Sequence, residues 1–231
     1  MRLGRAIGLG FSTALVLVAP PASASPVAPE QLVALLTTDQ PAYAVPEGRK
    51  LEVVSAHRPI TGEQTVLPVL GAQTISAQAV RWLQVELPGR PNGRRGWIKA
   101  NNVRLANTAW HIVVSRQHRT VTVYKGGRRL REMSAIVGKS STPTPRGEYF
   151  VEETVAEPPS AAGAPFALAL SARSDVLQEF DGGPGQIAIH GIQNIGGRLG
   201  TAVSHGCVRL ATSSIRWLAS RIDPGDPVTI Q

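Results

Sequence analysis

Cysteine is nearly absent from this sequence of 231 residues, since Cys207 is the only one. A single thiol can form neither an intramolecular disulfide bond nor a metal cluster built from several cysteines. It is therefore either a small buried apolar residue or a reactive group. Internal repeats and low-complexity tracts are also missing, and after residue 24 no segment is apolar enough to cross a bilayer. These absences exclude a disulfide framework and a repeat architecture.

The composition favours a β-rich globular fold. Hydrophobic residues make up 42% of the chain, which is enough to bury a core and excludes a wholly disordered protein. The 23 glycines and 18 prolines are spread along the sequence and predict short elements with many turns. A helical bundle is therefore disfavoured, and the length fits one large or two small domains.

The first 24 residues have the pattern of a secretory signal peptide. Arg2 and Arg5 supply the positive charge, residues 6–19 form an uncharged run, and Ala22-Ser23-Ala24 fits the cleavage pattern. An uncleaved membrane anchor is the alternative, but a helix of this run would be roughly 21 Å long where a bilayer needs roughly 30 Å. No cysteine follows the run, so a lipoprotein anchor is excluded. We expect export to the cell wall or medium, with no stable membrane anchor after cleavage.

Short strands dominate the first half after a leader over residues 25–49, in which residues 30–37 could form one or two helical turns. Residues 82–87 alternate between apolar and polar, the turn 88–93 carries Pro, Gly and Asn-Gly signals, and Gly96-Trp97-Ile98 begins a returning strand. Weaker strand candidates lie at 51–54 and 66–70. Residues 50–106 resemble a bacterial SH3-like domain, and a β-hairpin of another small domain is the alternative.

The second half, residues 107–231, carries a denser series of strands and one convincing helix. Ile215, Leu218, Ala219 and Ile222 have helical spacing, Thr212 or Ser213 can cap the helix, and a Pro-Gly pair ends it. The expected strands are 110–115, 120–124, a third ending near 137, 148–154, 166–171, 186–190 and 227–230. This pattern predicts an antiparallel or mixed sheet with one C-terminal helix packed on it.

The residues that can carry chemistry gather between positions 186 and 210. His190 ends a predicted strand on which Ala188 and His190 share one face. A glycine-rich loop follows, and then the run Ser204-His205-Gly206-Cys207-Val208-Arg209-Leu210. If Cys207 lies near the end of the histidine strand, thiol and imidazole can meet across the loop.

Such a pair suits nucleophilic catalysis. A thiol with an ordinary pKa of about 8.5 is mostly protonated at neutral pH, and a nearby imidazole can take the proton to leave a nucleophilic thiolate. A third group, often a backbone carbonyl, must hold the imidazole in one tautomer. Gly206 leaves the backbone before the nucleophile free to point N–H groups at an oxyanion, and one such donor is worth on the order of 3 kcal/mol.

His190-Gly191 followed by the run Ser204–Leu210 resembles the signature of the L,D-transpeptidase catalytic domain, also called the YkuD domain. The proline-bearing loop 142–147 and the C-terminal helix with its Pro-Val-Thr-Ile strand resemble the same family. The resemblance covers residues 109–231. It implies a mainly β protein in which a small SH3-like barrel precedes a YkuD-type β-sandwich with one C-terminal helix.

The resemblance also implies roles for individual residues. Cys207 corresponds to the nucleophile and His190 to its general base and acid. Some members orient the histidine with a serine side chain, but the residue here is Gly191, so only its backbone carbonyl can do so. The remaining motif residues are implied to shape the site, bind substrate or stabilise the oxyanion: Ser204, His205, Gly206 and Arg209.

The implied reaction is a two-step acyl transfer on peptidoglycan that needs no metal or organic cofactor. The thiolate attacks the third residue of a stem tetrapeptide, the terminal D-alanine leaves, and the side-chain amine of a second stem resolves the thioester into a 3-3 cross-link. Water in place of that amine would make an L,D-carboxypeptidase. The family is also acylated by carbapenem antibiotics. A non-catalytic wall-binding protein is the alternative from another class.

Rival patterns are weaker. His190, His205 and Cys207 are legitimate zinc ligands, but no fourth ligand accompanies them. Val137-Gly138-Lys139-Ser140 fails as a phosphate loop, because Met133 stands where that motif needs glycine. The arginine clusters at 94–95 and 128–131 are either solvated turns or contacts for anionic wall polymers, and a nucleic-acid partner is not expected. We expect the tryptophans to be core residues: Trp82, Trp97, Trp110 and Trp217.

Overall fold

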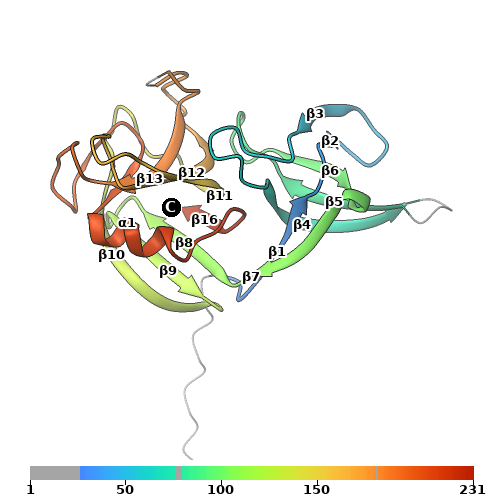
Figure 1. Cartoon of the computed structure of the whole chain (residues 1–231), viewed down its shortest axis with the longest axis horizontal. Coiled ribbons are helices and arrows are strands. Elements are labelled where there is room, and N and C mark those ends of the chain that lie inside the picture. Colours follow the sequence, from blue (N-terminus) through green and yellow to red (C-terminus); the bar gives the residue numbers. More distant parts are fainter. Residues whose placement is uncertain (1–26, 76–79, 181) are drawn as a thin grey trace, which may run out of the picture.

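The computed structural model describes residues 27–75, 80–180 and 182–231 and arranges them in two β-sheets that lie side by side (Figure 1). The predicted fold class, mainly β with one C-terminal α-helix, is confirmed for this described part. The predicted signal peptide lies outside the described residues. The SH3-like identity of the N-terminal sheet stays a prediction. Among the described residues, no helix has the length and apolar character needed to cross a membrane.

The N-terminal sheet has seven strands in the order β3-β2-β6-β5-β4-β1-β7. Its strands are β1 (Gln31–Leu36), β2 (Gln40–Tyr43), β3 (Lys50–Val54), β4 (Val66–Ile75), β5 (Val80–Glu86), β6 (Arg95–Lys99) and β7 (Val103–Thr108). One 3-10 turn, η1 (Ala100–Asn102), precedes β7. The sheet encloses an apolar core that includes Leu67, Leu83 and Ile98, and Phe150 of the C-terminal sheet is buried in the same core.

Strand β1 corrects the sequence prediction for residues 30–37. Instead of helical turns, this segment pairs antiparallel with β7 along its whole length and with β4 on its other side. Pairing on both edges satisfies the backbone hydrogen bonds that a helix would satisfy internally. The prediction of a leader over residues 25–49 is therefore wrong for β1 and β2, which belong to the sheet.

The C-terminal sheet has nine strands in the order β14-β10-β15-β13-β12-β11-β16-β8-β9. They are β8 (Trp110–Ser115), β9 (Thr120–Lys125), β10 (Arg128–Gly138), β11 (Gly147–Ala156), β12 (Phe166–Arg173), β13 (Gln186–Gly191), β14 (Ala202–Ser204), β15 (Val208–Leu210) and β16 (Pro227–Ile230). The first part of β10 pairs with β9 and its last part with β14 and β15, so the sheet curls back on itself. Its core includes Ile112, Leu168, Ile189 and Leu210.

Helix α1 (Thr212–Ala219) packs on β12 and β13 and carries the predicted apolar face, with Ile215 and Leu218 fully buried. The predicted cap is wrong: Ala211 occupies the N-cap position without a side-chain hydrogen bond, and Thr212 lies in the first turn. Among the tryptophans, Trp82 is a core residue with 1% exposure, whereas the other three are half-buried. Among the described residues, one short helix therefore lies behind β12 and β13, the second of which carries His190.

Candidate active site

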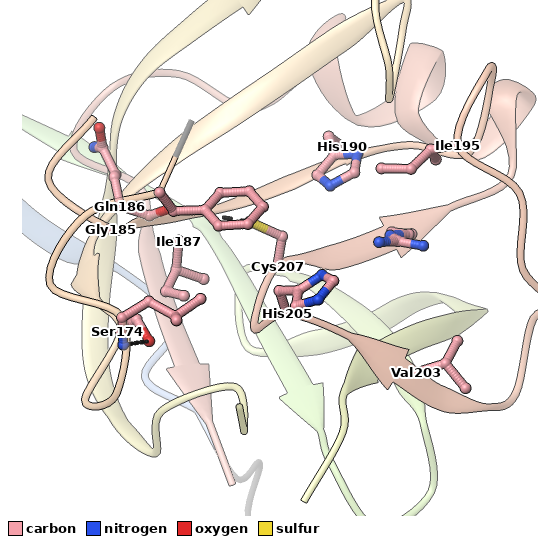
Figure 2. Close-up of a pocket in the computed structure, with 12 residues that line it drawn as sticks. Ser174, Gly185, Gln186, Ile187, His190, Ile195, Val203, His205 and Cys207 are labelled. Atoms are coloured by element: carbon pink, nitrogen blue, oxygen red, sulfur yellow. Dashed lines mark hydrogen bonds between the residues drawn. The ribbon is translucent and has the colours of Figure 1, made fainter. Parts of the chain in front are cut away.

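The parallel pair β13–β15 brings the two halves of the motif together. Ile189 lies opposite Val208 and His190 opposite Arg209. Because side chains alternate along a strand, Cys207, two residues before Arg209, lies toward the same face as His190. Figure 2 shows the side chains of His190, Cys207 and His205 directed toward one cavity. The meeting of thiol and imidazole that the sequence predicts is thus supported by the strand register.

This cavity has a volume of about 480 Å³, and its walls are largely apolar. Leu177, Phe180, Ile187, Ile195 and Val203 supply the apolar surface, while its reactive and polar groups are Ser174, Gln186, His190, His205, Cys207 and Arg209. Among the residues that the structure describes, no Asp or Glu lines it. An apolar pocket with a few convergent polar groups is the usual form of a small-ligand or active site.

The imidazole of His190 is held by the backbone of its neighbour. Its Nδ1 lies 2.8 Å from the carbonyl oxygen of Gly191, the contact predicted from the sequence. Since a carbonyl can only accept, Nδ1 carries the proton and Nε2 keeps its lone pair. Gly163 packs against the ring: a Cβ on this glycine would lie 2.4 Å from Nδ1, and the φ of +94° also favours glycine. Its carbonyl accepts the N–H of Gly191 at 2.7 Å.

Burial sets the protonation of both reactive groups. It lowers the pKa of His190, with a weaker opposing effect from the Gly191 hydrogen bond and a further lowering by Arg209. It raises the pKa of the Cys207 thiol, although the backbone N–H of Ala188 and the charge of Arg209 counteract this. Both groups are therefore neutral at rest near neutral pH. A thiolate would therefore form only if the thiol proton moved to Nε2 of His190.

The loop before Cys207 is fixed by hydrogen bonds within the C-terminal sheet. The buried hydroxyl of Ser204 donates to the Cys207 carbonyl at 2.6 Å and accepts the Gly206 N–H at 3.1 Å. Among the backbone N–H groups that the sequence predicts for an oxyanion, that of Gly206 donates to Ser204 in this conformation, so the oxyanion prediction stays untested for the others. Neither Ser204 nor Gly206 lines the cavity. Both residues shape the loop 205–207 between β14 and β15, named the nucleophile loop after the predicted role of Cys207. His205 and Arg209 face the cavity.

The proline-bearing loop 142–147 braces the nucleophile loop from behind. The Thr144 hydroxyl donates to the Gly206 carbonyl at 2.7 Å and accepts the Gly138 N–H at 2.9 Å. The Thr142 hydroxyl donates to the Ser204 carbonyl at 3.3 Å. Gly206 itself has a φ of +124°, which explains why glycine precedes the cysteine. The sequence linked this loop to the site only through its resemblance.

Arg209 presents a partly unused guanidinium to the cavity. Its Nη1 donates to the Gly196 carbonyl at 3.4 Å, and its buried Nε has no hydrogen-bond partner among the described residues. A guanidinium with free donors in an otherwise apolar pocket is suited to bind a carboxylate. For the zinc alternative, the described residues contain no group of three or more His, Cys, Asp or Glu placed to hold a metal ion.

Several cavity residues carry no signal in the sequence. Leu177 and Phe180 come from the β12–β13 loop, and the Phe180 ring stacks on His205 with centroids 5.6 Å apart. Gly163 lies in another loop, far from His190 in the sequence, and the fold brings it against the imidazole ring. Ile195 and Val203 are single apolar residues outside any periodic pattern. Long-range placement, rather than a local motif, brings these residues to the site.

Comparisons with known proteins converge on one family. The sequence profile of the L,D-transpeptidase catalytic domain, YkuD, matches residues 109–230. A Bacillus licheniformis protein named as an L,D-transpeptidase YkuD is 32% identical over 121 residues, which cover 52% of this chain and 65% of the relative. L,D-transpeptidase 1 of Mycobacterium tuberculosis is 25% identical over 224 residues, covering 75% of this chain and 86% of the relative. The chain thus matches just under two thirds of the Bacillus protein.

Among solved structures, L,D-transpeptidase 3 from Mycobacterium tuberculosis in complex with a faropenem-derived adduct aligns with a TM-score of 0.47 and 18% identity. The alignment covers 76% of this chain and 92% of that structure.

Proposed function

Because the chain belongs to the L,D-transpeptidase family with a YkuD catalytic domain, we propose that it is a cysteine-dependent acyltransferase that forms 3-3 cross-links between peptidoglycan stems. The observation that carries this proposal is the common face of β13 and β15. His190, with Nε2 unprotonated, and the thiol of Cys207 both line one cavity there. That arrangement is what acyl transfer through a thioester requires.

In the first step, the sulfur of Cys207 attacks the carbonyl carbon of the third residue of a stem tetrapeptide. The thiol proton moves to Nε2 of His190 as the S–C bond forms. The C–N bond to the terminal D-alanine then breaks, and His190 returns the proton to the leaving amine. A thioester on Cys207 and free D-alanine result, so the imidazole acts first as base and then as acid.

In the second step, the side-chain amine of another stem attacks the thioester. His190 accepts the amine proton as the new amide forms, and the sulfur leaves and is reprotonated. The peptide cross-link is released and the neutral Cys207 thiol is restored. Water in place of the amine would give a shortened stem, which is the carboxypeptidase outcome.

Arg209 is the proposed contact for a carboxylate of the stem. Its Nε lacks a partner, and no acidic side chain among the described cavity residues competes for it. The proposed location is outside the cytoplasm, supported by the signal pattern of residues 1–24. There the net charge of +6 that remains after loss of Arg2 and Arg5 would attract the protein to anionic wall polymers.

The test is incubation of the purified protein with tetrapeptide stems, followed by mass spectrometry of the products. Cross-linked dimers are expected, and Cys207→Ala should form none. Shortened stems without dimers would indicate the carboxypeptidase instead. If neither product appears, exposure to a carbapenem decides further: a folded protein with no adduct on Cys207 would favour a wall-binding role and contradict the enzyme.

A further inference from the structure

One wall of the catalytic cavity is a loop with little support of its own. The β12–β13 loop, described for residues 174–180 and 182–185, contributes Leu177, Phe180 and Gly185 to the cavity. Phe180 is 49% exposed even though its ring stacks on His205. Val176, beside Leu177, is 51% exposed. A loop with so few buried apolar side chains draws little stability from packing.

Hydrogen bonds within this loop close its base and its tip. The Ser174 N–H donates to the Gly185 carbonyl at 2.8 Å, and the Ser174 hydroxyl accepts the Leu177 N–H at 3.0 Å. Near the tip, Phe180 and Gly183 exchange two backbone hydrogen bonds of 2.9 and 3.0 Å. These bonds define the shape of the loop. They do not fix its position over Cys207.

The N-terminal sheet supplies that anchor through the turn between β5 and β6. The guanidinium of Arg90 donates to three loop carbonyls: Pro184 at 2.7 Å, Ser174 at 2.9 Å and Leu177 at 2.9 Å. These carbonyls belong to both sides of the loop, so one side chain ties them together. The planar guanidinium can donate several hydrogen bonds in fixed directions, which an ammonium group cannot reproduce.

Asn92, two residues further along the same turn, holds the point where the loop leaves β12. Its Oδ1 accepts the Arg173 N–H at 2.8 Å, and its Nδ2 donates to the Arg173 carbonyl at 2.8 Å. The same Nδ2 also donates to the Asp175 carboxylate at 3.0 Å. The amide thus pairs with the backbone of Arg173 as a neighbouring strand would.

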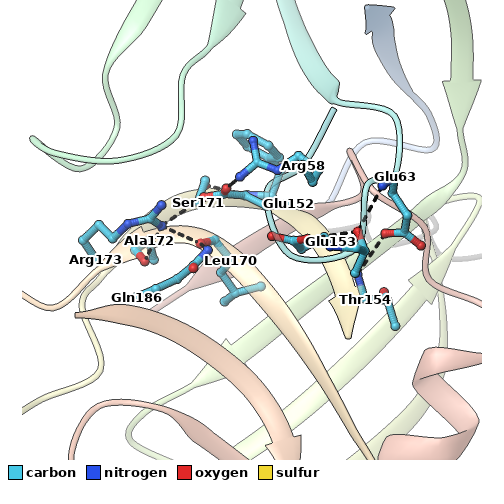
Figure 3. Close-up of polar contacts among 12 residues, drawn as sticks. Arg58, Glu63, Glu152, Glu153, Thr154, Leu170, Ser171, Ala172, Arg173 and Gln186 are labelled. Atoms are coloured by element: carbon cyan, nitrogen blue, oxygen red, sulfur yellow. Dashed lines mark hydrogen bonds and ion pairs between the residues drawn. The ribbon is translucent and has the colours of Figure 1, made fainter. Parts of the chain in front are cut away.

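Arg173 is also held by a second set of contacts, which involves Arg58 from the N-terminal part of the chain. Figure 3 shows Glu152 of β11 between Arg58, from the segment that follows β3, and Arg173. Glu152 forms ion pairs with both arginines, and its side chain is fully buried. Arg173 Nη1 also donates to the Leu170 carbonyl at 2.9 Å. The end of β12 is therefore fixed from two directions by the N-terminal sheet.

From these contacts we propose that Arg90 and Asn92 are positioning residues: they hold the β12–β13 loop against the Cys207 cavity, so that the N-terminal sheet completes the binding wall for the donor stem. The proposal rests on the proposed transpeptidase function. Neither residue contacts the cavity itself. Both act through the loop, whereas hydrogen bonds within the C-terminal part of the chain hold the His190 ring and the backbone around Cys207.

The test compares Arg90→Ala and Asn92→Asp with Arg104→Ala, a control in the same sheet whose guanidinium contacts Gln64. Arg90→Ala should lower kcat/KM for thioester formation from a tetrapeptide donor about tenfold, mostly through a higher KM, because the binding wall is displaced. Asn92→Asp keeps the acceptor and loses the donor, so a smaller decrease is expected. Alkylation of Cys207 by iodoacetamide should not slow in either variant.

Loop order is measured separately by chymotrypsin cleavage after Leu177 and Phe180, which does not depend on any activity. Cleavage should be at least several-fold faster in Arg90→Ala than in wild type or Arg104→Ala. Unchanged cleavage with unchanged donor kinetics would overturn the proposal, and so would equal losses of donor and iodoacetamide reactivity. If wild type forms no thioester, the proposed function fails, and faster cleavage would still support the anchor.

Discussion

The two sides of the cavity are held in different ways. The nucleophile side is braced within the C-terminal sheet, where Ser204 and Thr144 bond the backbone around Gly206 and Cys207. The opposite wall, the β12–β13 loop, is tied to the N-terminal sheet by Arg90 and Asn92. The geometry of the reacting atoms is therefore a property of one sheet, whereas the shape of the binding wall depends on both. Substitutions on the two sides should give different kinetic signatures.

The largest effect should come from removing the base. His190→Ala should lower kcat/KM for thioester formation by about 10²–10⁴-fold, because no group remains to take the Cys207 proton. The fold should be retained, since the imidazole hydrogen-bonds the adjacent Gly191 carbonyl and no other side chain. Stopped-time mass spectrometry of the adduct, with circular dichroism as the folding control, checks both points. A loss below threefold in a folded variant would contradict the role of His190.

A smaller loss is expected from crowding the imidazole. Gly163→Ala would place a Cβ 2.4 Å from Nδ1 of His190, at a φ of +94°. The ring must shift, and a displaced base costs on the order of 100-fold in rate. Gly200→Ala is a matched control, because its φ of +81° carries similar backbone strain but a Cβ there meets no described atom within 4 Å. Equal activity of the two variants would show that the ring position is unimportant.

Thr144→Val tests whether the nucleophile side of the cavity responds differently from the wall that Arg90 holds. It removes the hydroxyl between Gly206 and Gly138 and leaves a buried carbonyl unpaired, at a cost of about 2 kcal/mol in the free energy of unfolding. Because the nucleophile loop loosens, donor acylation and iodoacetamide alkylation should fall together, unlike in Arg90→Ala. Paired rate measurements and urea denaturation check this. If Thr144→Val slowed donor acylation but not alkylation, the two sides of the cavity would not have the separate roles proposed for them.

The smallest effect on catalytic activity is expected from Glu86, which acts only on the stability of the sheet that supports the loop. Burial raises the pKa of Glu86, on β5, to about 8, with the charge of Glu148 adding to the shift. The folded state thus retains a proton that the unfolded chain loses near pH 4.3, so stability from this group falls as pH rises toward 8. Glu86→Gln should be more stabilising at pH 8 than at pH 5, by about 3 kcal/mol, because the pKa of about 8 lies more than three units above that of the unfolded chain. Urea denaturation at the two pH values tests this, and a pH-independent difference would contradict it.

The sequence singles out the candidate pair of Cys207 and His190 because the motif is local and chemically unusual. His190 ends a strand with clear alternation, and Cys207 lies in a short run of rare residue types. The C-terminal helix was equally visible from the spacing of Ile215, Leu218 and Ala219, although it ends at Ala219 and leaves Ile222 outside. These features depend on neighbours in the chain, which a sequence displays directly.

Other parts depend on contacts between distant segments. Strand β1 lacks a clear alternating pattern and is fixed by pairing with β4 and β7. Strands β14 and β15 have three residues each, too few for any periodicity. The sequence also gives no sign that the Gly206 N–H donates to the side chain of Ser204. The anchor at Arg90 joins residues more than 80 positions apart, and no local pattern marks it.

The most direct test of the account is the mass of the peptide containing Cys207 after brief incubation of the wild-type protein with a tetrapeptide stem. The account predicts an increase equal to the stem without its terminal D-alanine, absent in Cys207→Ala and strongly reduced in His190→Ala. A folded wild-type protein that releases D-alanine or cross-linked product without ever carrying this adduct would contradict the thioester mechanism.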